Sequence, residues 1–255
     1  MRAFFQFFLE SSDRSLFNRL AKLMWVAFFA GITGIVILFT ALSYTDLPSV
    51  EELENPQTDQ ASQIFAGSGE VLGRYYTENR VPVSFDKLSP HLVDALIATE
   101  DERFYQHTGI DFPALGRVVV KTVLLGQKSS GGASTITQQL AKLLFTGQKA
   151  SSIYKRAFQK LKEWIIAIRL ERKYTKEEIL AMYLNKFNFI NGAYGIKAAA
   201  EIYFNKSQEN LSVEEAAMLV GMLKNPSLFN PLRRPDTVLQ RRMVVLSQMA
   251  KNNYI

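Results

Sequence analysis

Apolar and polar positions follow different patterns in successive parts of the chain. Residues 23–44 carry no charge and are apolar on every face, and a helix of about 20 such residues crosses a bilayer core. Within residues 63–84, short apolar runs flank a Gly-Ser-Gly turn, which predicts a β-hairpin, with a third strand expected at 81–85. From Ser89 onward, apolar residues recur at helical spacing. The chain is therefore predicted to be mainly α, with a small β element.

The C-terminal part is predicted to form a succession of helices. The first begins at Ser89-Pro90, because proline suits the first helical position. Capping-box sequences that begin at Thr175 and Ser212 mark the starts of later helices. Further helices are expected at residues 112–125, 135–145, 152–172, 176–184, 195–204, 213–223 and 235–251.

The predicted organisation is a cytoplasmic N-terminus, a single transmembrane helix, a linker with the small β element, and a helical domain, at residues 1–22, 23–44, 45–88 and 89–255. Basic residues precede the apolar segment (Arg14, Arg19 and Lys22), whereas acidic residues follow it. Since positive flanks stay in the cytoplasm, the helical domain is expected on the outer face of the cytoplasmic membrane. A buried core helix is the alternative for the apolar segment, but its uniform apolarity and polar flanks argue against that reading.

Charge and composition narrow the class of partner. The 255-residue chain has a net charge of +6 and a pI near 9.4, which favours phosphate, a lipid headgroup or nucleic acid. The predicted outward orientation argues against nucleic acid and against a nucleotide supply, so the substrate is expected to arrive already activated, for instance as a lipid pyrophosphate. The chain has no cysteine, and its histidines, His91 and His107, leave little room for a zinc site.

The run EDERFYQHTGID, residues 100–111, contains the first candidate for catalysis. Glu100 lies four residues after Leu96 and three after Ile97, so a helix places it at the edge of the buried stripe. A half-buried carboxylate there is suited to general base catalysis. On spacing alone, an ordinary solvated carboxylate at a helix end is the simpler interpretation.

The second run, GGASTITQQLAK, spans residues 131–142. A plain loop followed by a helix capped by Ser134 or Thr135 would account for it. Free N–H groups at a helix start also bind anions, and glycines let the backbone approach a substrate closely. Gln138 and Lys142 are four residues apart and share a helical face.

These runs, in this order, resemble the peptidoglycan glycosyltransferase family, family 51 of the glycosyltransferases. That family includes the polymerase module of bifunctional penicillin-binding proteins of the 1A type and the monofunctional transglycosylases. The family patterns E-D-x-x-F-x-x-H-x-G-I-D and G-A-S-T-I-T-Q-Q-L-x-K are matched throughout. The resemblance implies a lysozyme-like helical domain with Glu100 as the general base. The residues implied to bind substrate are Asp101, Phe104, His107, Gly132, Ser134, Thr135, Gln138, Lys142, Lys155, Lys160 and Asn185.

A third run departs from the family pattern R-K-x-x-E. Lys160 and Glu163 match it, whereas Gln159 replaces the arginine. Lys155, with Arg156 next to it, occupies the place of a further cation, and Lys149 is a reserve candidate. A surface ion pair between Lys160 and Glu163, worth a few tenths of a kcal/mol, is the simpler interpretation. The resemblance implies instead that Glu163 is a second catalytic acid that orients the pyrophosphate through a cation or a divalent metal, expected to be Mg²⁺.

Two further segments leave alternatives open. In residues 183–204, which follow another family pattern, Ile190 replaces a glycine. Asn185, Gly192 and Gly195 either shape the part of the site that binds the acceptor substrate or act as turn residues. Residues 112–128 combine an apolar body with basic side chains and form either a core helix or, as we favour, a helix in the outer leaflet.

The resemblance implies a membrane-anchored enzyme that polymerises lipid II into β-1,4 glycan strands with inversion and releases undecaprenyl pyrophosphate. Its expected partners are lipid II, undecaprenyl-pyrophosphate-linked glycan, the membrane and other cell-wall synthesis proteins, with no nucleic acid. The alternatives are a lysozyme-like enzyme that cleaves peptidoglycan and a non-catalytic cell-wall scaffold. The cleaving enzyme needs carboxylates but no pyrophosphate site, so the lysines of the second and third runs favour the polymerase.

Overall fold

The structure is a computed structural model that describes residues 14–43, 62–65, 67, 71–75, 82–121, 132–146 and 152–255. It divides into compact units at Met1–Leu47 and Pro48–Ile255, and each is described by itself. The predicted linker at residues 45–61 lies outside the described residues.

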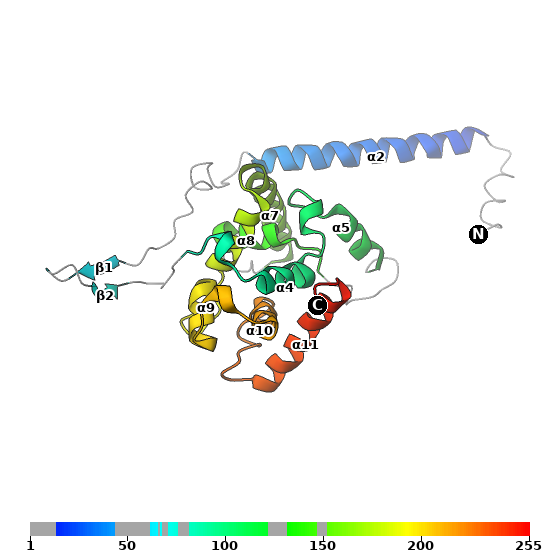
Figure 1. Ribbon diagram of the computed structural model, residues 1–255. Helices are drawn as coiled ribbons and strands as arrows, with labels where there is room; N and C mark the ends of the chain where they lie inside the picture. The colour runs from blue at the N-terminus through cyan, green and yellow to red at the C-terminus, as the bar shows by residue number, and fades with distance from the viewer. Residues whose placement is uncertain are drawn as a thin grey trace. The chain divides into compact units, whose positions relative to one another are not determined.

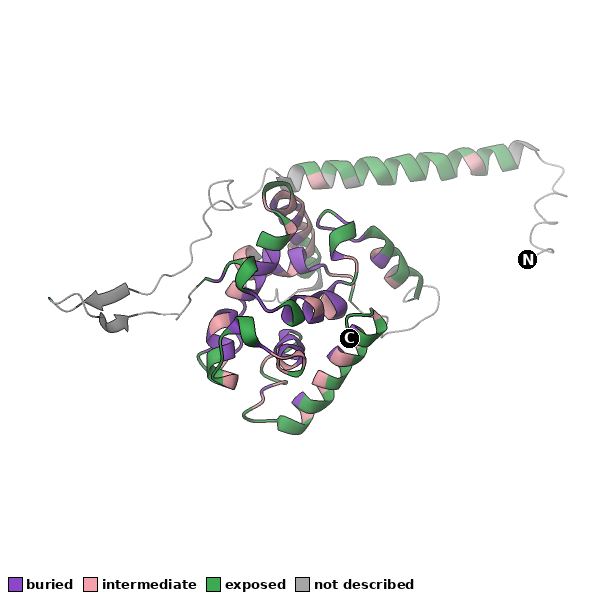
Figure 2. Cartoon of the chain, viewed as in Figure 1, coloured by how far each residue is buried: buried purple, intermediate pink, exposed green. Residues whose placement is uncertain are grey.

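The first unit contains a long helix, α2, which spans Arg14–Ser43 (Figure 1). Large apolar side chains along it are exposed, including Trp25, Phe29 and Val36 (Figure 2). The predicted segment at 23–44 is therefore helical as far as Ser43. In the part of the chain that the structure describes, no helix meets the combined length and hydropathy of a membrane span, so the predicted crossing is not confirmed.

The second unit begins with the predicted β-hairpin. Strand β1 (Ser62–Phe65) pairs antiparallel with β2 (Val71–Tyr75), with Ser62 opposite Tyr75. The expected third strand is absent from its described residues, 82–85. Phe85 instead begins a 3₁₀ turn, η1 (Phe85–Lys87), and the Lys87 N–H donates to the Ser84 carbonyl.

Helices make up the rest of the second unit, as predicted. They are α4 (Pro90–Glu100), α5 (Phe112–Val119), α6 (Ile136–Ala141), α7 (Ile153–Lys173), α8 (Lys176–Lys186), α9 (Gly195–Phe204), α10 (Val213–Leu223) and α11 (Pro235–Lys251). Short 3₁₀ turns occur at η2 (Phe104–Gln106) and η5 (Gln208–Asn210), and α6 continues as a π-helix, η4 (Lys142–Thr146). The predicted continuation of α5 at 122–125 lies outside the described residues.

Local sequence signals account for several helix starts. Thr175 and Ser212 form the predicted capping boxes of α8 and α10. Of the candidate caps of α6, Thr135 takes the position, because its Oγ1 accepts from the Gln138 N–H. The start of α6 is therefore held by its own side chains.

The core forms where α4 packs against α10 and α11, and where α6 packs against α7 and α8. Its buried positions are purple in Figure 2, and α4 and α10 are buried over most of their length. Large side chains with almost no exposed area include Leu96, Ile136, Leu170 and Tyr183. Each contributes roughly 1.5–3 kcal/mol through burial. This packing fixes the C-terminal end of α4 and the start of α6 relative to α7, α8 and α11.

Candidate active site

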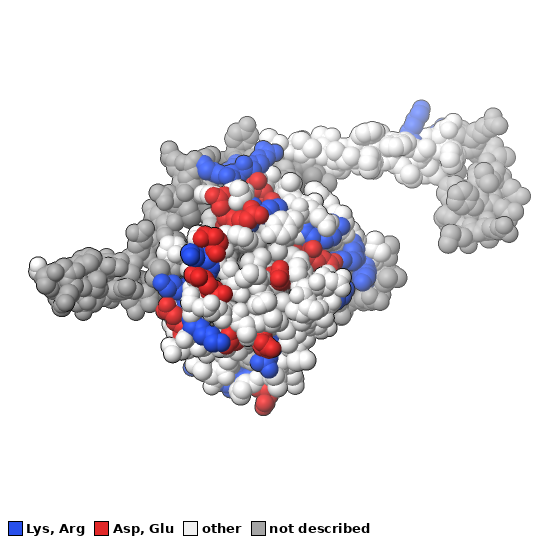
Figure 3. All heavy atoms as spheres, viewed as in Figure 1, with Lys and Arg blue, Asp and Glu red and all other residues white. Residues whose placement is uncertain are grey.

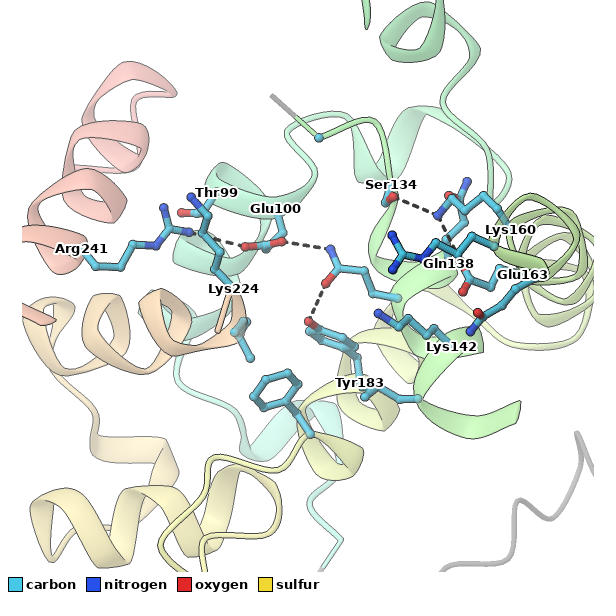
Figure 4. Close-up of a pocket in the computed structure, with 17 residues that line it drawn as sticks. Thr99, Glu100, Ser134, Gln138, Lys142, Lys160, Glu163, Tyr183, Lys224 and Arg241 are labelled. Atoms are coloured by element: carbon cyan, nitrogen blue, oxygen red, sulfur yellow. Dashed lines mark hydrogen bonds and ion pairs between the residues drawn. The ribbon is translucent and has the colours of Figure 1, made fainter. Parts of the chain in front are cut away.

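A cleft with a volume of 780 Å³ lies between these helices (Figure 4). Seven of its lining residues belong to the predicted site: Glu100, Gly132, Ser134, Gln138, Lys142, Lys160 and Glu163. Figure 4 shows Glu100 and the Lys160–Glu163 pair at separate ends of the cleft, with Tyr183 between them. The structure therefore brings an acidic end and a basic end, predicted from separate runs, into one cleft.

Glu100 is the last residue of α4 and points into the cleft. The preceding turn is anchored by buried Leu96 and Ile97, which leaves the carboxylate 15% exposed. Its Oε2 accepts from the Gln139 Nε2 at 2.9 Å, and its Oε1 lies 3.8 Å from the Arg241 Nη2. Glu100 is thus a half-desolvated acceptor held from α6 and α11.

A second, smaller hollow of 350 Å³ also reaches Glu100. It shares Thr99, Glu100, Ser134 and Arg241 with the larger cleft, among other residues. Its lining also includes the basic residues Arg117, Lys121 and Lys251 and the acidic residues Asp101, Glu102 and Asp111. Because the carboxylate lines both hollows, a group bound in either one can reach it.

The basic end of the cleft is built around Lys160. Its Nζ donates to the Ser134 Oγ at 2.9 Å and to the Glu163 Oε2 at 3.1 Å, joining α7 to the second run. Lys142 and Arg156 line the same end. Both Lys155 and Arg156 are exposed, but among the described residues Arg156 lines the cleft and Lys155 does not, which favours Arg156. Lys149 lies outside the described residues.

On the face shown in Figure 3, basic and acidic side chains are interspersed over the helical unit. The net positive charge therefore does not form one continuous patch on that face. The cations that a leaving anion would meet are those that line the cleft.

Asp101 and His107 lie below the cleft and hold the first and second runs together. Asp101 is 7% exposed, and its Oδ2 is 3.0 Å from the His107 Nε2 and accepts from the Ile136 N–H at 3.1 Å. The Gly109 N–H donates to the His107 Nδ1 at 3.3 Å. His107 is buried, so both residues are structural in this conformation, although Asp101 also lines the smaller hollow.

Thr135 and Gln138 complete this network from the start of α6. Both side chains donate to the Gly109 carbonyl, at 2.8 Å from Thr135 and 3.1 Å from Gln138. The Gln138 Oε1 is buried without a hydrogen-bond partner among the described residues. Gln138 therefore joins the start of α6 to the Gly109 backbone, and the Thr135 hydroxyl also serves the helix cap.

Phe104 and Asn185, which were predicted to bind substrate, make contacts inside the protein. Phe104 has no exposed surface, because it packs inside the domain with the Lys176 ammonium 4.2 Å above its ring. Asn185 is bound to the backbone of Val83, donating to the carbonyl at 2.7 Å and accepting from the N–H at 3.0 Å. For these residues the structural role displaces the predicted binding role.

Ile190, which occupies the position of a family glycine, lies in a left-handed turn. Ile190 and Asn191 have φ angles of 58° and 51°, so the turn keeps that conformation without the glycine. Gly192 and Gly195 also have positive φ, of 81° each. For these glycines the structure supports the turn-residue alternative.

The predicted metal site rests on Glu163 alone. This carboxylate is 5% exposed and is paired with Lys160. Within the described ranges, no group of three histidine, aspartate or glutamate side chains is arranged to hold an ion. Mg²⁺ commonly takes one or two protein carboxylates together with substrate phosphates, so a single carboxylate at the basic end fits such an ion only when a phosphate is also bound.

Sequence reasoning did not assign roles to Gln139, Tyr183, Lys224 and Arg241, all of which line the cleft. Gln139 and Tyr183 lie inside the sequence runs that resemble the family, so the sequence contained a signal that could have identified them. Lys224 and Arg241 come from the end of α10 and from α11, and no local pattern links them to Glu100. Burial lowers the pKa of Arg241, while the nearby Glu100 charge opposes that shift.

Comparison with known proteins identifies the family of this chain. A family model described as Transglycosylase matches residues 68–250. Penicillin-binding protein 1A of Aquifex aeolicus (strain VF5) is 40% identical over 232 residues, which is 88% of this chain and 31% of that protein. Penicillin-binding protein 1A of Escherichia coli (strain K12) is 42% identical over 209 residues, or 82% of this chain and 24% of that protein.

Among solved structures, the crystal structure of penicillin-binding protein 1A from Haemophilus influenzae matches 78% of this chain and 19% of that one, with 26% identity and a TM-score of 0.42. The chain spans less than a third of the length of the Aquifex and Escherichia relatives. The family match extends over most of the residues, from the hairpin to the last helix. This chain belongs to the transglycosylase family.

Proposed function

We propose that this chain is a membrane-anchored peptidoglycan glycosyltransferase that polymerises lipid II into β-1,4 glycan strands. The observation that carries the proposal is the single cleft that holds the Glu100 carboxylate and, at its other end, Lys142, Arg156 and Lys160. A base near one end and cations near the other suit a displacement in which a hydroxyl attacks and a pyrophosphate leaves.

In the proposed reaction, Glu100 takes the proton from the 4-hydroxyl of the acceptor N-acetylglucosamine. The hydroxyl oxygen forms a bond to the anomeric carbon of the donor sugar as the bond from that carbon to the pyrophosphate oxygen breaks. The electron pair of the broken bond leaves with undecaprenyl pyrophosphate, and the single displacement inverts α to β. Lys142, Arg156 and Lys160 stabilise the charge that develops on the leaving group.

Two hollows at Glu100 suit two sugar substrates, because one carboxylate must reach the acceptor hydroxyl beside the donor carbon. We assign the pyrophosphate of the donor to the larger cleft, where the Lys160–Ser134 contact lies. A divalent ion such as Mg²⁺ would be held by Glu163 and the pyrophosphate oxygens. Bound there, it supplies positive charge to the leaving group.

The membrane anchor is proposed to be helix α2, with the N-terminus in the cytoplasm and the helical unit outside. Support comes from the sequence, in which residues 23–43 are uncharged, and from the exposed apolar side chains of the helix. On α5, Phe112 is 69% exposed, which suits a helix at a lipid surface. A lipid-linked substrate would lie in the same bilayer as the anchor, so the anchor would keep the enzyme close to its substrate.

The proposal is tested by incubating the full chain with labelled lipid II, with and without Mg²⁺, and resolving the products by length. We expect wild-type protein to form polymer and Glu100→Gln to lose nearly all turnover, because an amide cannot accept the proton. Glu201→Gln makes the same change at an exposed position on α9 and is expected to keep full activity.

A parallel incubation with finished glycan strands separates the alternatives. Cleavage of those strands without polymer formation would indicate the peptidoglycan-cleaving enzyme and refute the proposal. Absence of both activities, or an unchanged rate in Glu100→Gln, would refute it as well.

A further inference from the structure

Both oxygens of the Glu100 carboxylate are engaged by neighbouring helices. The Gln139 Nε2 of α6 donates to Oε2 at 2.9 Å, and the Arg241 Nη2 of α11 lies 3.8 Å from Oε1. The side chains of Glu100 and Arg241 are 15% and 11% exposed, so both contacts lie largely out of water. Electrostatic interactions gain strength under such conditions. One oxygen of the carboxylate is therefore held by a hydrogen bond from α6, and the other faces a cation from α11.

Hydrogen-bond chemistry allows Gln139 only one orientation. An ionised carboxylate only accepts hydrogen bonds, so the NH₂ end of the amide faces Glu100 and the oxygen end faces Tyr183. The Tyr183 hydroxyl, 2.9 Å from the Gln139 Oε1, must then be the donor. Figure 4 traces this chain of contacts from Tyr183 through the amide to Glu100.

Tyr183 is suited to a permanent donor role. It is 1% exposed, and burial raises the pKa of its hydroxyl well above the ordinary value, with the nearby Glu100 charge adding to the effect. The hydroxyl accordingly keeps its proton at any pH at which an enzyme of this kind works. Tyr183 can thus hold the amide without taking part in proton transfer.

Arg241 is itself held in place from α10 and the segment that follows it. Its Nε donates to the Gly221 carbonyl at 3.3 Å, and its guanidinium lies 5.7 Å from the centre of the Phe229 ring. A Cβ on Gly221 would meet the Arg241 Cγ at 3.1 Å, so the glycine allows this close approach. These contacts aim the guanidinium at Glu100 without help from substrate.

We propose that Tyr183, Gln139 and Arg241 are positioning residues that orient the Glu100 carboxylate, with Arg241 also placing a positive charge beside it. The proposal rests on the proposed function of Glu100 as the base. Tyr183 acts only through Gln139, whereas Arg241 acts directly on the carboxylate. The other charged groups that line the two hollows are Asp101, Glu102, Asp111, Arg117, Lys121, Lys142, Arg156, Lys160, Glu163, Lys224 and Lys251.

The first test is a double-mutant cycle on the rate of lipid II polymerisation. Tyr183→Phe removes only the hydroxyl, so the Gln139 amide loses the contact that holds its oxygen end and becomes less well fixed against Glu100. We expect kcat to fall about 10-fold, the effect of roughly 1.4 kcal/mol, with little change in KM. In a Gln139→Leu background the same substitution is expected to have no further effect. Equal losses in both backgrounds would show that Tyr183 acts independently of Gln139 and would overturn the proposal.

The second test needs no turnover. The titration of the Glu100 carboxyl is followed by ¹³C NMR of the full chain, with the signal assigned by its loss in Glu100→Gln. In Arg241→Met the signal is expected to titrate at a higher pH than in wild type, because the carboxylate has lost its neighbouring cation. Arg241→Lys, which keeps the charge, is expected to restore most of the shift.

Arg242→Met is the matched control, since it removes the same charge one residue along α11, where the side chain lines a different hollow. We expect the midpoint to stay at its wild-type value in this variant. Equal midpoints in Arg241→Met and wild type, or equal shifts in both arginine variants, would overturn the role of Arg241. A chain that fails to polymerise lipid II refutes the proposed function, whereas the titration still decides this inference.

Discussion

At the scale of single residues, neighbouring carboxylates have different tasks because their surroundings differ. Glu100 ends α4 at the cleft and accepts from only one side-chain N–H. Asp101, the next residue, turns inward and is saturated by His107 and the Ile136 N–H. The spacing in the sequence could place Glu100 at the edge of the buried stripe. Only the turn of the chain after α4 decides that Asp101 points the other way.

Asp111 leads to a prediction about pH. Its side chain caps α5 through the Ala114 N–H and is paired with Arg103. Burial acts to raise the pKa of Asp111, but the hydrogen bonds and the Arg103 charge outweigh it and lower the pKa below its ordinary value of 3.8. A lowered pKa means that this stabilisation is present above pH 3.8 and is lost as the pH falls through the folded-state pKa.

We expect Asp111→Asn to reduce the free energy of unfolding by about 1–2 kcal/mol at pH 7, because the amide keeps the cap but loses the charged pair. The deficit should shrink as the pH falls below about 4, where the wild type loses the same interaction. Urea titrations at pH 7 and pH 3 measure both values. Asp236→Asn, at an exposed position of α11, is the control, and an equal deficit at both pH values in Asp111→Asn would contradict the argument.

At the scale of elements, the starts of helices and the turns at glycines determine where the residues that line the cleft lie. Thr135 begins α6 and thereby sets the position of Gln138 and Gln139. Gly195 begins α9 and lets the chain pass against the backbone of α8, where its N–H donates to the Phe187 carbonyl. That contact steadies the end of α8, the helix that carries Tyr183. Local conformation and site geometry are thus connected through short turns.

Gly195 and Gly192 give a matched pair of substitutions. Both have a φ of +81°, but a Cβ on Gly195 would lie 2.7 Å from the Asn185 carbonyl oxygen, whereas one on Gly192 meets nothing within 4 Å. Gly192→Ala is expected to cost about 1–2 kcal/mol from backbone strain alone. Gly195→Ala is expected to cost about 2–4 kcal/mol, because the clash with backbone adds to the strain. Thermal unfolding of both variants measures the difference, and equal losses would show that the close contact has no energetic weight.

At the scale of the whole molecule, helix α2 and the helical unit differ in where their apolar side chains lie. Helix α2 exposes apolar side chains along its length, whereas the helical unit buries its own in a core. Exposed apolar surface on this scale is costly in water and points to a lipid or protein partner. The proposed function gives α2 the lipid partner.

Charged substitutions in α2 test that assignment. Ile32→Lys combined with Val36→Lys places charges one turn apart near the middle of the apolar segment, where each costs about 2.5–3.5 kcal/mol in a bilayer. We expect the wild type to stay with membranes through alkaline extraction and the double variant to be released in large part. Asn18→Lys adds a charge before the apolar segment and is expected to stay bound. Retention of the double variant at the wild-type level would refute the anchor.

The sequence by itself determined the helices and the residue types of the candidate site. Helical periodicity, capping boxes and the Gly-Ser-Gly turn are local properties, so the predicted ranges for α7 to α11 and the hairpin agree with the structure. The third strand at 81–85 was predicted wrongly, since short apolar runs occur in turns as well as strands. The lysozyme-like architecture remains a prediction.

Tertiary structure alone decided which candidates meet. Phe104 and Asn185 look like site residues in sequence order, but packing and backbone contacts commit them to the interior and to Val83. Arg241 looks like any helix surface arginine until α11 folds against α4 and brings it to Glu100. The physical reason is that backbone preference depends on nearby residues, whereas burial, pairing and the shape of a cleft depend on residues that are distant in the chain.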